Sequence, residues 1–125
     1  MNLIADLLSR FRRKPRAWWQ AFDVSFDEHS VVIRERCPRK VREERFSWSS
    51  VRRVCFKDRG LSSDVFFVFT ADRDGAFMVP VEAKGGNAFW DALRQRRLFP
   101  DEISAAAIRS TDGAYYCWPE EEFSE

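Results

Sequence analysis

The sequence contains a single histidine, His29, which directly follows Asp27 and Glu28. A Ser-His-Asp or Cys-His arrangement would have to be built around this residue, because an imidazole is the usual general base at neutral pH. The stretch from Asp27 to Ser30 is, however, typical of a turn between two strands, and the carboxylates are scattered along the chain. We therefore expect a protein that is not an enzyme, and we name no catalytic residue.

Three cysteines, Cys37, Cys55 and Cys117, are the other candidate reactive groups. A structural zinc site needs about four Cys or His ligands, usually in closely spaced pairs, and the wide spacing here lacks such pairs. The number of cysteines is odd, and no two of them form a Cys-x-x-Cys pair. The apolar N-terminal stretch does not fit a secretion signal, because Asp6 interrupts it. These features favour reduced thiols in a cytoplasmic protein. We expect neither a metal nor a cofactor.

Two features could bind an anion. Gly85 and Gly86 precede a predicted helix but lack the spacing of a phosphate-binding loop, so an ordinary turn capped by Asn87 is favoured. Five basic residues around a predicted hairpin could contact lipid headgroups or phosphates; they are Arg34, Arg36, Arg39, Lys40 and Arg42. Interleaved glutamates favour cross-strand charge pairing on a solvated hairpin instead. Nucleic acid is not expected as a partner.

The N-terminus predicts an amphipathic helix that Pro15 ends at about Lys14. An apolar stripe precedes a group of cations and two tryptophans, a combination that could contact an anionic membrane surface or a partner. These contact residues are Leu3, Ile4, Leu7, Leu8, Phe11, Arg12, Arg13, Lys14, Arg16, Trp18 and Trp19. The alternative is that the stripe packs on the domain or on a second copy of the chain, which would give a homo-oligomer.

Alternating apolar residues predict the elements that position these groups. The stretch from Asp64 to Ala71 is apolar on both faces, and we interpret it as a central strand covered on both sides. Further strands are predicted at residues 22–26, 31–36, 41–46, 54–56, 77–82 and 115–118. Charged residues place the strand at residues 41–46 at a sheet edge. Pro80 places the strand at residues 77–82 at an edge or gives it a bulge. Helical spacing predicts one principal helix, Asn87–Leu98, whereas residues 103–108 are ambiguous.

These elements predict an α+β fold that is mainly antiparallel β. A chain of 125 residues can bury one core. We divide it into an N-terminal amphipathic basic helix (1–19), a single domain (20–118) and an acidic tail (119–125). Residues 1–53 carry 13 basic and 7 acidic side chains, and residues 54–125 carry 8 and 13. No apolar run approaches the roughly 20 residues that span a bilayer, so we expect a cytoplasmic protein, peripheral at the inner membrane face if the N-terminus docks there.

Four stretches carry a resemblance to a known family. They are the run from Phe46 to Val54 with its Trp-x-x-Val-x-x-Val spacing, the central strand, the strand from Phe77 to Glu82, and the helix start from Gly86 to Leu93. Over about residues 20–100 this pattern resembles small stand-alone bacterial proteins of unknown function with a pleckstrin-homology-like fold. The resemblance implies a bent sheet or partly open barrel closed by a C-terminal helix.

That architecture has seven strands, whereas six are predicted before the helix. Either one strand is missed, or residues 115–118 complete the sheet from the other end. An ordinary α+β roll is the competing description. Because pleckstrin-homology-like domains are binding scaffolds, we expect a non-enzymatic binding or adaptor module for an unidentified protein partner. The alternatives are a peripheral membrane protein that docks through its basic N-terminus, and an inhibitor or immunity-type protein.

Overall fold

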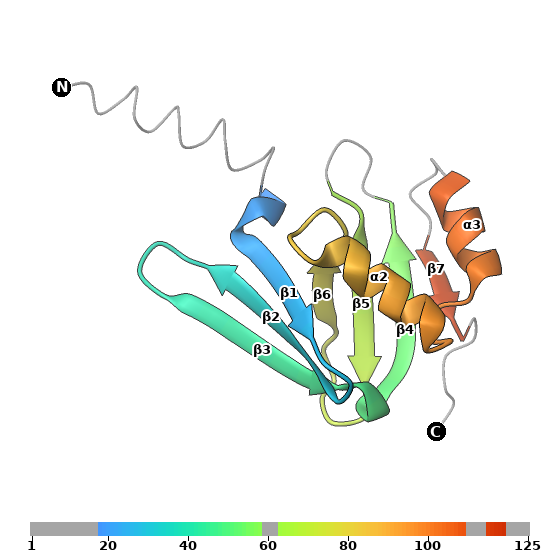
Figure 1. Cartoon of the computed structure of the whole chain (residues 1–125), viewed down its shortest axis with the longest axis horizontal. Helices are drawn as coiled ribbons and strands as arrows, with labels where there is room; N and C mark the ends of the chain where they lie inside the picture. Colours follow the sequence, from blue (N-terminus) through green and yellow to red (C-terminus); the bar gives the residue numbers. More distant parts are fainter. Residues whose placement is uncertain (1–17, 59–62, 110–114, 120–125) are drawn as a thin grey trace.

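The computed structural model describes residues 18–58, 63–109 and 115–119. Within these residues the fold is α+β and mainly antiparallel, with two open sheets (Figure 1). In chain order the elements are η1 (Trp18–Ala21), β1 (Phe22–Phe26), β2 (Ser30–Arg36), β3 (Val41–Ser47), η2 (Trp48–Ser50), β4 (Val51–Lys57), β5 (Val65–Thr70), β6 (Phe77–Pro80), α2 (Gly86–Gln95), α3 (Asp101–Arg109) and β7 (Tyr115–Trp118).

The first sheet has the order β1-β2-β3, so β3 lies at an edge, as its charges predicted. One face of this sheet is buried, because a strand points successive side chains to opposite sides; its core residues are Phe22, Val24, Val31, Ile33 and Phe46. The β1–β2 turn forms at Asp27, whose backbone N–H donates to the carbonyl of Ser30 at 3.0 Å. After β3 the short η2 buries Trp48, and its indole N–H donates to the carbonyl of Asp27 at 2.8 Å.

The second sheet has the order β6-β5-β4-β7. β6 lies at an edge and ends at Pro80, which confirms the edge position that this proline predicted. β7 pairs with β4 at the opposite edge. The C-terminal strand therefore completes the sheet from the other end, which is one of the two possibilities that the sequence left open.

The helix α2 lies over β6, β5 and β4 in Figure 1 and contributes buried residues to the core. Phe89 and Leu93 are fully buried, and Trp90 is half-buried. The ring of Phe89 stacks on Trp48 with centroids 5.8 Å apart and also contacts Phe66 edge to face. The predicted packing of this helical face on the sheets is thus confirmed.

The predicted ends of this helix are wrong. It begins at Gly86 with Gly85 as the cap, not at Asn87, and it ends at Gln95 instead of Leu98. Gly85 has a φ of 85°, and a Cβ there would collide with the carbonyl of Val24, so the close approach of β1 requires glycine. At the other end Arg97 adopts a φ of 61°, which stops the helix.

A second helix, α3, occupies the stretch that the sequence left ambiguous. Pro100 precedes it, and the carbonyl of Pro100 accepts the N–H of Ser104 at 3.0 Å. The hydroxyl of Ser104 is buried and accepts the indole N–H of Trp90 at 3.1 Å, which ties α3 to α2. Figure 1 shows α3 beside β7. No helix within the described residues is both long and apolar enough to cross a membrane.

Candidate functional site

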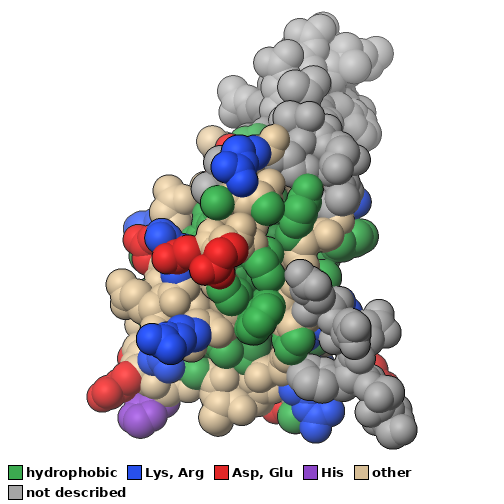
Figure 2. All heavy atoms as spheres, turned by 90° about the vertical axis from the view of Figure 1, so that its right-hand side faces the viewer, with side chains coloured by type: hydrophobic (Ala, Val, Ile, Leu, Met, Phe, Trp, Pro, Cys, Tyr) green, Lys and Arg blue, Asp and Glu red, His purple; other side chains and the backbone are tan. Residues whose placement is uncertain are grey.

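The outer face of the second sheet carries a shallow groove of about 370 Å³, which we call the outer-sheet groove. It is lined by Arg53, Cys55, Phe67, Phe69, Tyr115 and Cys117. These residues come from β4, β5 and β7, on the side of the sheet that faces away from α2. Figure 2 shows hydrophobic side chains gathered in the middle of the molecular face on which β7 and α3 lie.

The prediction that the central strand is covered on both sides is wrong for this outer face. Within β5, Phe66 and Val68 point into the core and are fully buried, whereas Phe67 is half-buried and Phe69 is 36% exposed. Tyr115 on β7 is 58% exposed. The described part of the chain therefore leaves an aromatic surface uncovered on a strand whose composition is typical of two-sided burial.

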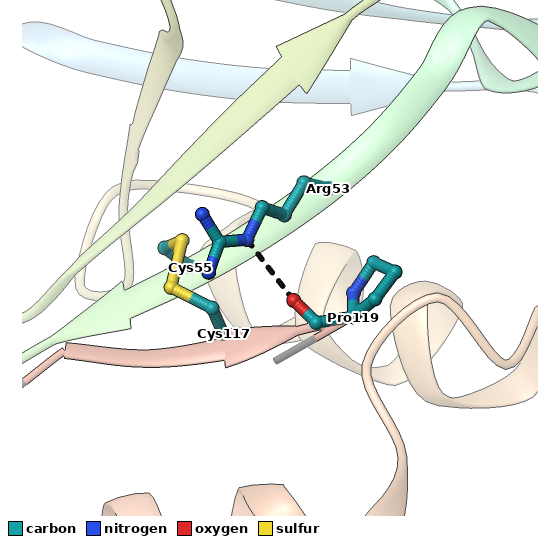
Figure 3. The surroundings of a disulfide bond; sticks show 4 residues. All are labelled: Arg53, Cys55, Cys117 and Pro119. Carbon is teal, nitrogen blue, oxygen red and sulfur yellow. Dashed lines mark hydrogen bonds between the residues drawn. A yellow bond between two sulfur atoms is a disulfide. The ribbon is translucent and has the colours of Figure 1, made fainter. Parts of the chain in front are cut away.

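A disulfide between Cys55 and Cys117 lies in this groove (Figure 3). The prediction of reduced thiols is therefore wrong for these two residues, while Cys37 is free and half-buried. The antiparallel register of β4 and β7 places Cys55 directly opposite Cys117, with their Cα atoms 4.0 Å apart. Residues separated by 62 positions meet only through this pairing, so spacing along the sequence could not reveal the bond.

Two cations border the outer-sheet groove. The Nε of Arg53 donates to the carbonyl of Pro119 at 3.0 Å, just beyond the end of β7 (Figure 3). The Nζ of Lys57 lies 4.3 Å from the ring centroid of Tyr115, close enough for a cation–π interaction. The ring of Tyr115 lies 6.2 Å from that of Phe67. No carboxylate lines this groove among the residues that the structure describes.

A second hollow, of about 570 Å³, lies on the other side of β7. Its lining includes Tyr116 from β7 and residues of α3, and it shares Arg53, Tyr115 and Cys117 with the outer-sheet groove. The α3 residues are Glu102, Ile103 and Ala106. β7 thus forms a wall common to both hollows. Any movement of this short strand would change the shape of both.

The basic residues predicted to contact an anion mostly pair with carboxylates. Arg34 contacts Glu43 at 3.0 Å, and Arg42 contacts Glu35 at 3.3 Å, in both cases directly across β2 and β3. Arg36 contacts Asp23 at 3.7 Å. Cross-strand charge pairing, the alternative that the interleaved glutamates favoured, is confirmed. Exposed Arg39 and Lys40 lie in the β2–β3 turn, and anion binding there stays a prediction.

Most of the predicted N-terminal contact residues, from Leu3 to Arg16, lie outside the described residues. Trp18 and Trp19 form the start of η1. Trp18 is half-buried and packs edge to face on Phe22, with ring centroids 5.7 Å apart. This tryptophan therefore contributes to the core of the domain.

His29 and Asp27 lie in the exposed β1–β2 turn. The backbone N–H groups of Ser30 and His29 each donate to Oδ1 of Asp27 at 2.8 Å, and these bonds lower the pKa of the Asp27 carboxyl. The predicted turn is confirmed. In the described ranges no three His, Cys, Asp or Glu side chains gather as a metal site would require.

The sequence pattern does not single out Phe67, Phe69 or Tyr115 as site residues. The available signal is the apolar character of both faces of the central strand, a pattern that predicts two-sided burial. No family model, curated protein or solved structure matches the chain.

Proposed function

We propose that the chain is a non-enzymatic binding module that recognises an extended segment of another protein in the outer-sheet groove. The observation that carries the proposal is the aromatic surface on the second sheet, where the described residues leave Phe69 and Tyr115 exposed beside half-buried Phe67. Exposed aromatic side chains are enriched where proteins contact one another. An uncovered group of them on a well-packed domain marks an interaction surface.

The chemistry of the partner follows from the lining of the groove. The aromatic floor favours apolar side chains, and Arg53 with neighbouring Lys57 favours carboxylates beside them. The half-open shape, with Tyr115 58% exposed, suits a chain segment lying along the surface. Small-molecule sites, in contrast, enclose most of their ligand. We therefore infer an acidic segment with apolar anchors as the partner.

This proposal includes a pleckstrin-homology-like scaffold. Two antiparallel sheets with α2 packed on them are consistent with that architecture, and β7 gives a seventh strand to the described residues. The cytoplasm remains the proposed location. Thiols there are kept largely reduced, so a cytoplasmic disulfide is usually transient.

A selection from a phage-displayed library of linear peptides tests the proposed function. The target is the oxidised protein, and the variant Phe69→Asp places a negative charge in the groove at an exposed position. The matched control is Val41→Asp, which adds the same charge to the 58% exposed edge of the first sheet. We expect enriched peptides that combine apolar residues with Asp or Glu and that bind the control but not Phe69→Asp.

Two results would count against the proposal. Peptides that bind Phe69→Asp as well as the parent protein would place recognition outside the groove, and a selection without enrichment would remove the evidence for a peptide ligand. Light scattering over a range of protein concentrations tests a competing occupant. Association of the parent but not of Phe69→Asp would assign the groove to a second copy of this chain.

A further inference from the structure

We infer that the Cys55–Cys117 disulfide is a redox gate for the outer-sheet groove, which is assembled when the bond is formed and loses a wall when it is reduced. This inference rests on the proposed function, because it concerns the regulation of the same groove. It starts from the position of the bond: β7 supplies Tyr115 and Cys117 to the groove, and the disulfide joins the middle of β7 to β4.

Apart from this bond, β7 is held by a short ladder and by half-buried side chains. It has four residues, none of them buried, and it pairs with β4 alone at the edge of the sheet. Tyr115 and Trp118 at its ends are exposed, whereas Tyr116 is half-buried against the core and α3 contacts the strand. Short edge segments with few buried contacts belong to the low-stability part of a native structure. The disulfide is thus the strongest single attachment of this strand.

The bond is also placed for exchange with an external thiol. Cys55 is only 4% exposed, whereas Cys117 is half-buried and lines both hollows beside β7. A thiolate of an external dithiol attacks the Cys117 sulfur, and the electron pair of the S–S bond leaves on the Cys55 sulfur, which takes up a proton. The second thiolate of the dithiol then attacks the mixed disulfide. The Cys117 sulfur leaves as a thiolate with the electron pair of the mixed disulfide and takes up a proton, and the external dithiol is oxidised to a cyclic disulfide.

After reduction, β7 retains four ladder positions with β4, the packing of Tyr116 on the core beside α3, and the contacts of Arg53 with Pro119 and of Lys57 with Tyr115. A larger share of molecules then has β7 detached from β4. A detached β7 removes Tyr115 and Cys117 from the groove, so a ligand binds only the attached fraction. If that fraction falls to about one tenth, the apparent affinity falls about tenfold.

The experiment compares oxidised protein with protein reduced by dithiothreitol. The motion of β7 is measured by the heteronuclear ¹H–¹⁵N NOE of residues 115–118, with Val65–Thr70 of β5 as an internal reference. Groove binding is measured with 1-anilinonaphthalene-8-sulfonate, a probe with an aromatic body and one anionic group. We expect reduction to lower the NOE of β7 but not of β5, and to weaken probe binding about tenfold or more.

Variants separate the gate from other effects of a reductant. Cys55→Ala combined with Cys117→Ala should behave as reduced protein without added dithiothreitol and should no longer respond to it. The matched control is Cys37→Ala, which removes the free half-buried thiol and leaves the disulfide intact; it should respond like the parent.

The inference is overturned if β7 keeps its NOE after reduction or in the double variant. It is also overturned if dispersed signals are lost throughout, because the bond would then hold the entire fold. Failure of the proposed function has a different signature. If the oxidised protein and its Phe69→Asp variant bind the probe equally, the groove is not the binding surface, whereas the NOE comparison still decides whether reduction frees β7.

Discussion

The Cys55–Cys117 bond should contribute strongly to the free energy of unfolding. It joins residues separated by 62 positions. In the chain-entropy model, a cross-link over a loop of about 60 residues removes roughly 14 cal/mol/K from the unfolded ensemble, which is about 4 kcal/mol at 25 °C. Reduction frees the unfolded chain and so favours unfolding. Partial release of β7 in the reduced native state would lower the difference, so we expect about 2–4 kcal/mol.

Urea unfolding measures this difference in the Cys37→Ala background, where thiol exchange with a third cysteine cannot occur. Oxidised and reduced forms then have the same composition. With a slope of about 2 kcal/mol/M, a loss of 4 kcal/mol lowers the midpoint by about 2 M. A difference below about 1 kcal/mol would refute the reasoning, since it would show that the bond places no substantial constraint on the unfolded chain.

Four further predictions concern other parts of the chain. Phe89→Ala should lower the free energy of unfolding by about 3–5 kcal/mol in urea titrations, because it empties a fully buried site between the two sheets. Gly85→Ala should cost more than about 1 kcal/mol in the same assay, since its φ is 85° and a Cβ would meet backbone, whereas Gly75→Ala, with open space around it, should cost much less. NMR of the side-chain carboxyl should show a pKa of Asp27 below the ordinary value of 3.8. Because the pKa is lowered in the folded state, this carboxylate stabilises the fold above its unfolded-state pKa, and the contribution is lost as the pH falls through its folded-state pKa. If residues 1–19 bind anionic lipid, the intact protein should co-sediment with anionic vesicles at low salt, but not at high salt or with neutral vesicles. A form that begins at Ala17 should stay in solution.

The sequence by itself determined most of the local structure. The alternation in Phe22, Val24 and Phe26 predicts β1 correctly, because side chains on one face of a strand recur every second residue. The spacing of Phe89 and Leu93 predicts the buried face of α2, because residues four positions apart lie on the same face of a helix. Charges on β3 and a proline in β6 correctly placed both strands at sheet edges. Each of these signals is contained within a few neighbouring residues.

The candidate site depended on contacts that no local pattern contains. The apolar outer face of β5 indicated burial, yet only the arrangement of both sheets with α2 decided that Phe69 lies outside the core. The sequence predicts Asn87 as the helix cap, whereas the structure has Gly85 there, because the backbone of β1, distant in sequence, approaches this position. Cys55 and Cys117 meet only when β7 pairs antiparallel with β4. Pairing and register between distant strands follow from how the entire chain packs its apolar faces, so the tertiary structure alone decided the disulfide and the groove beside it.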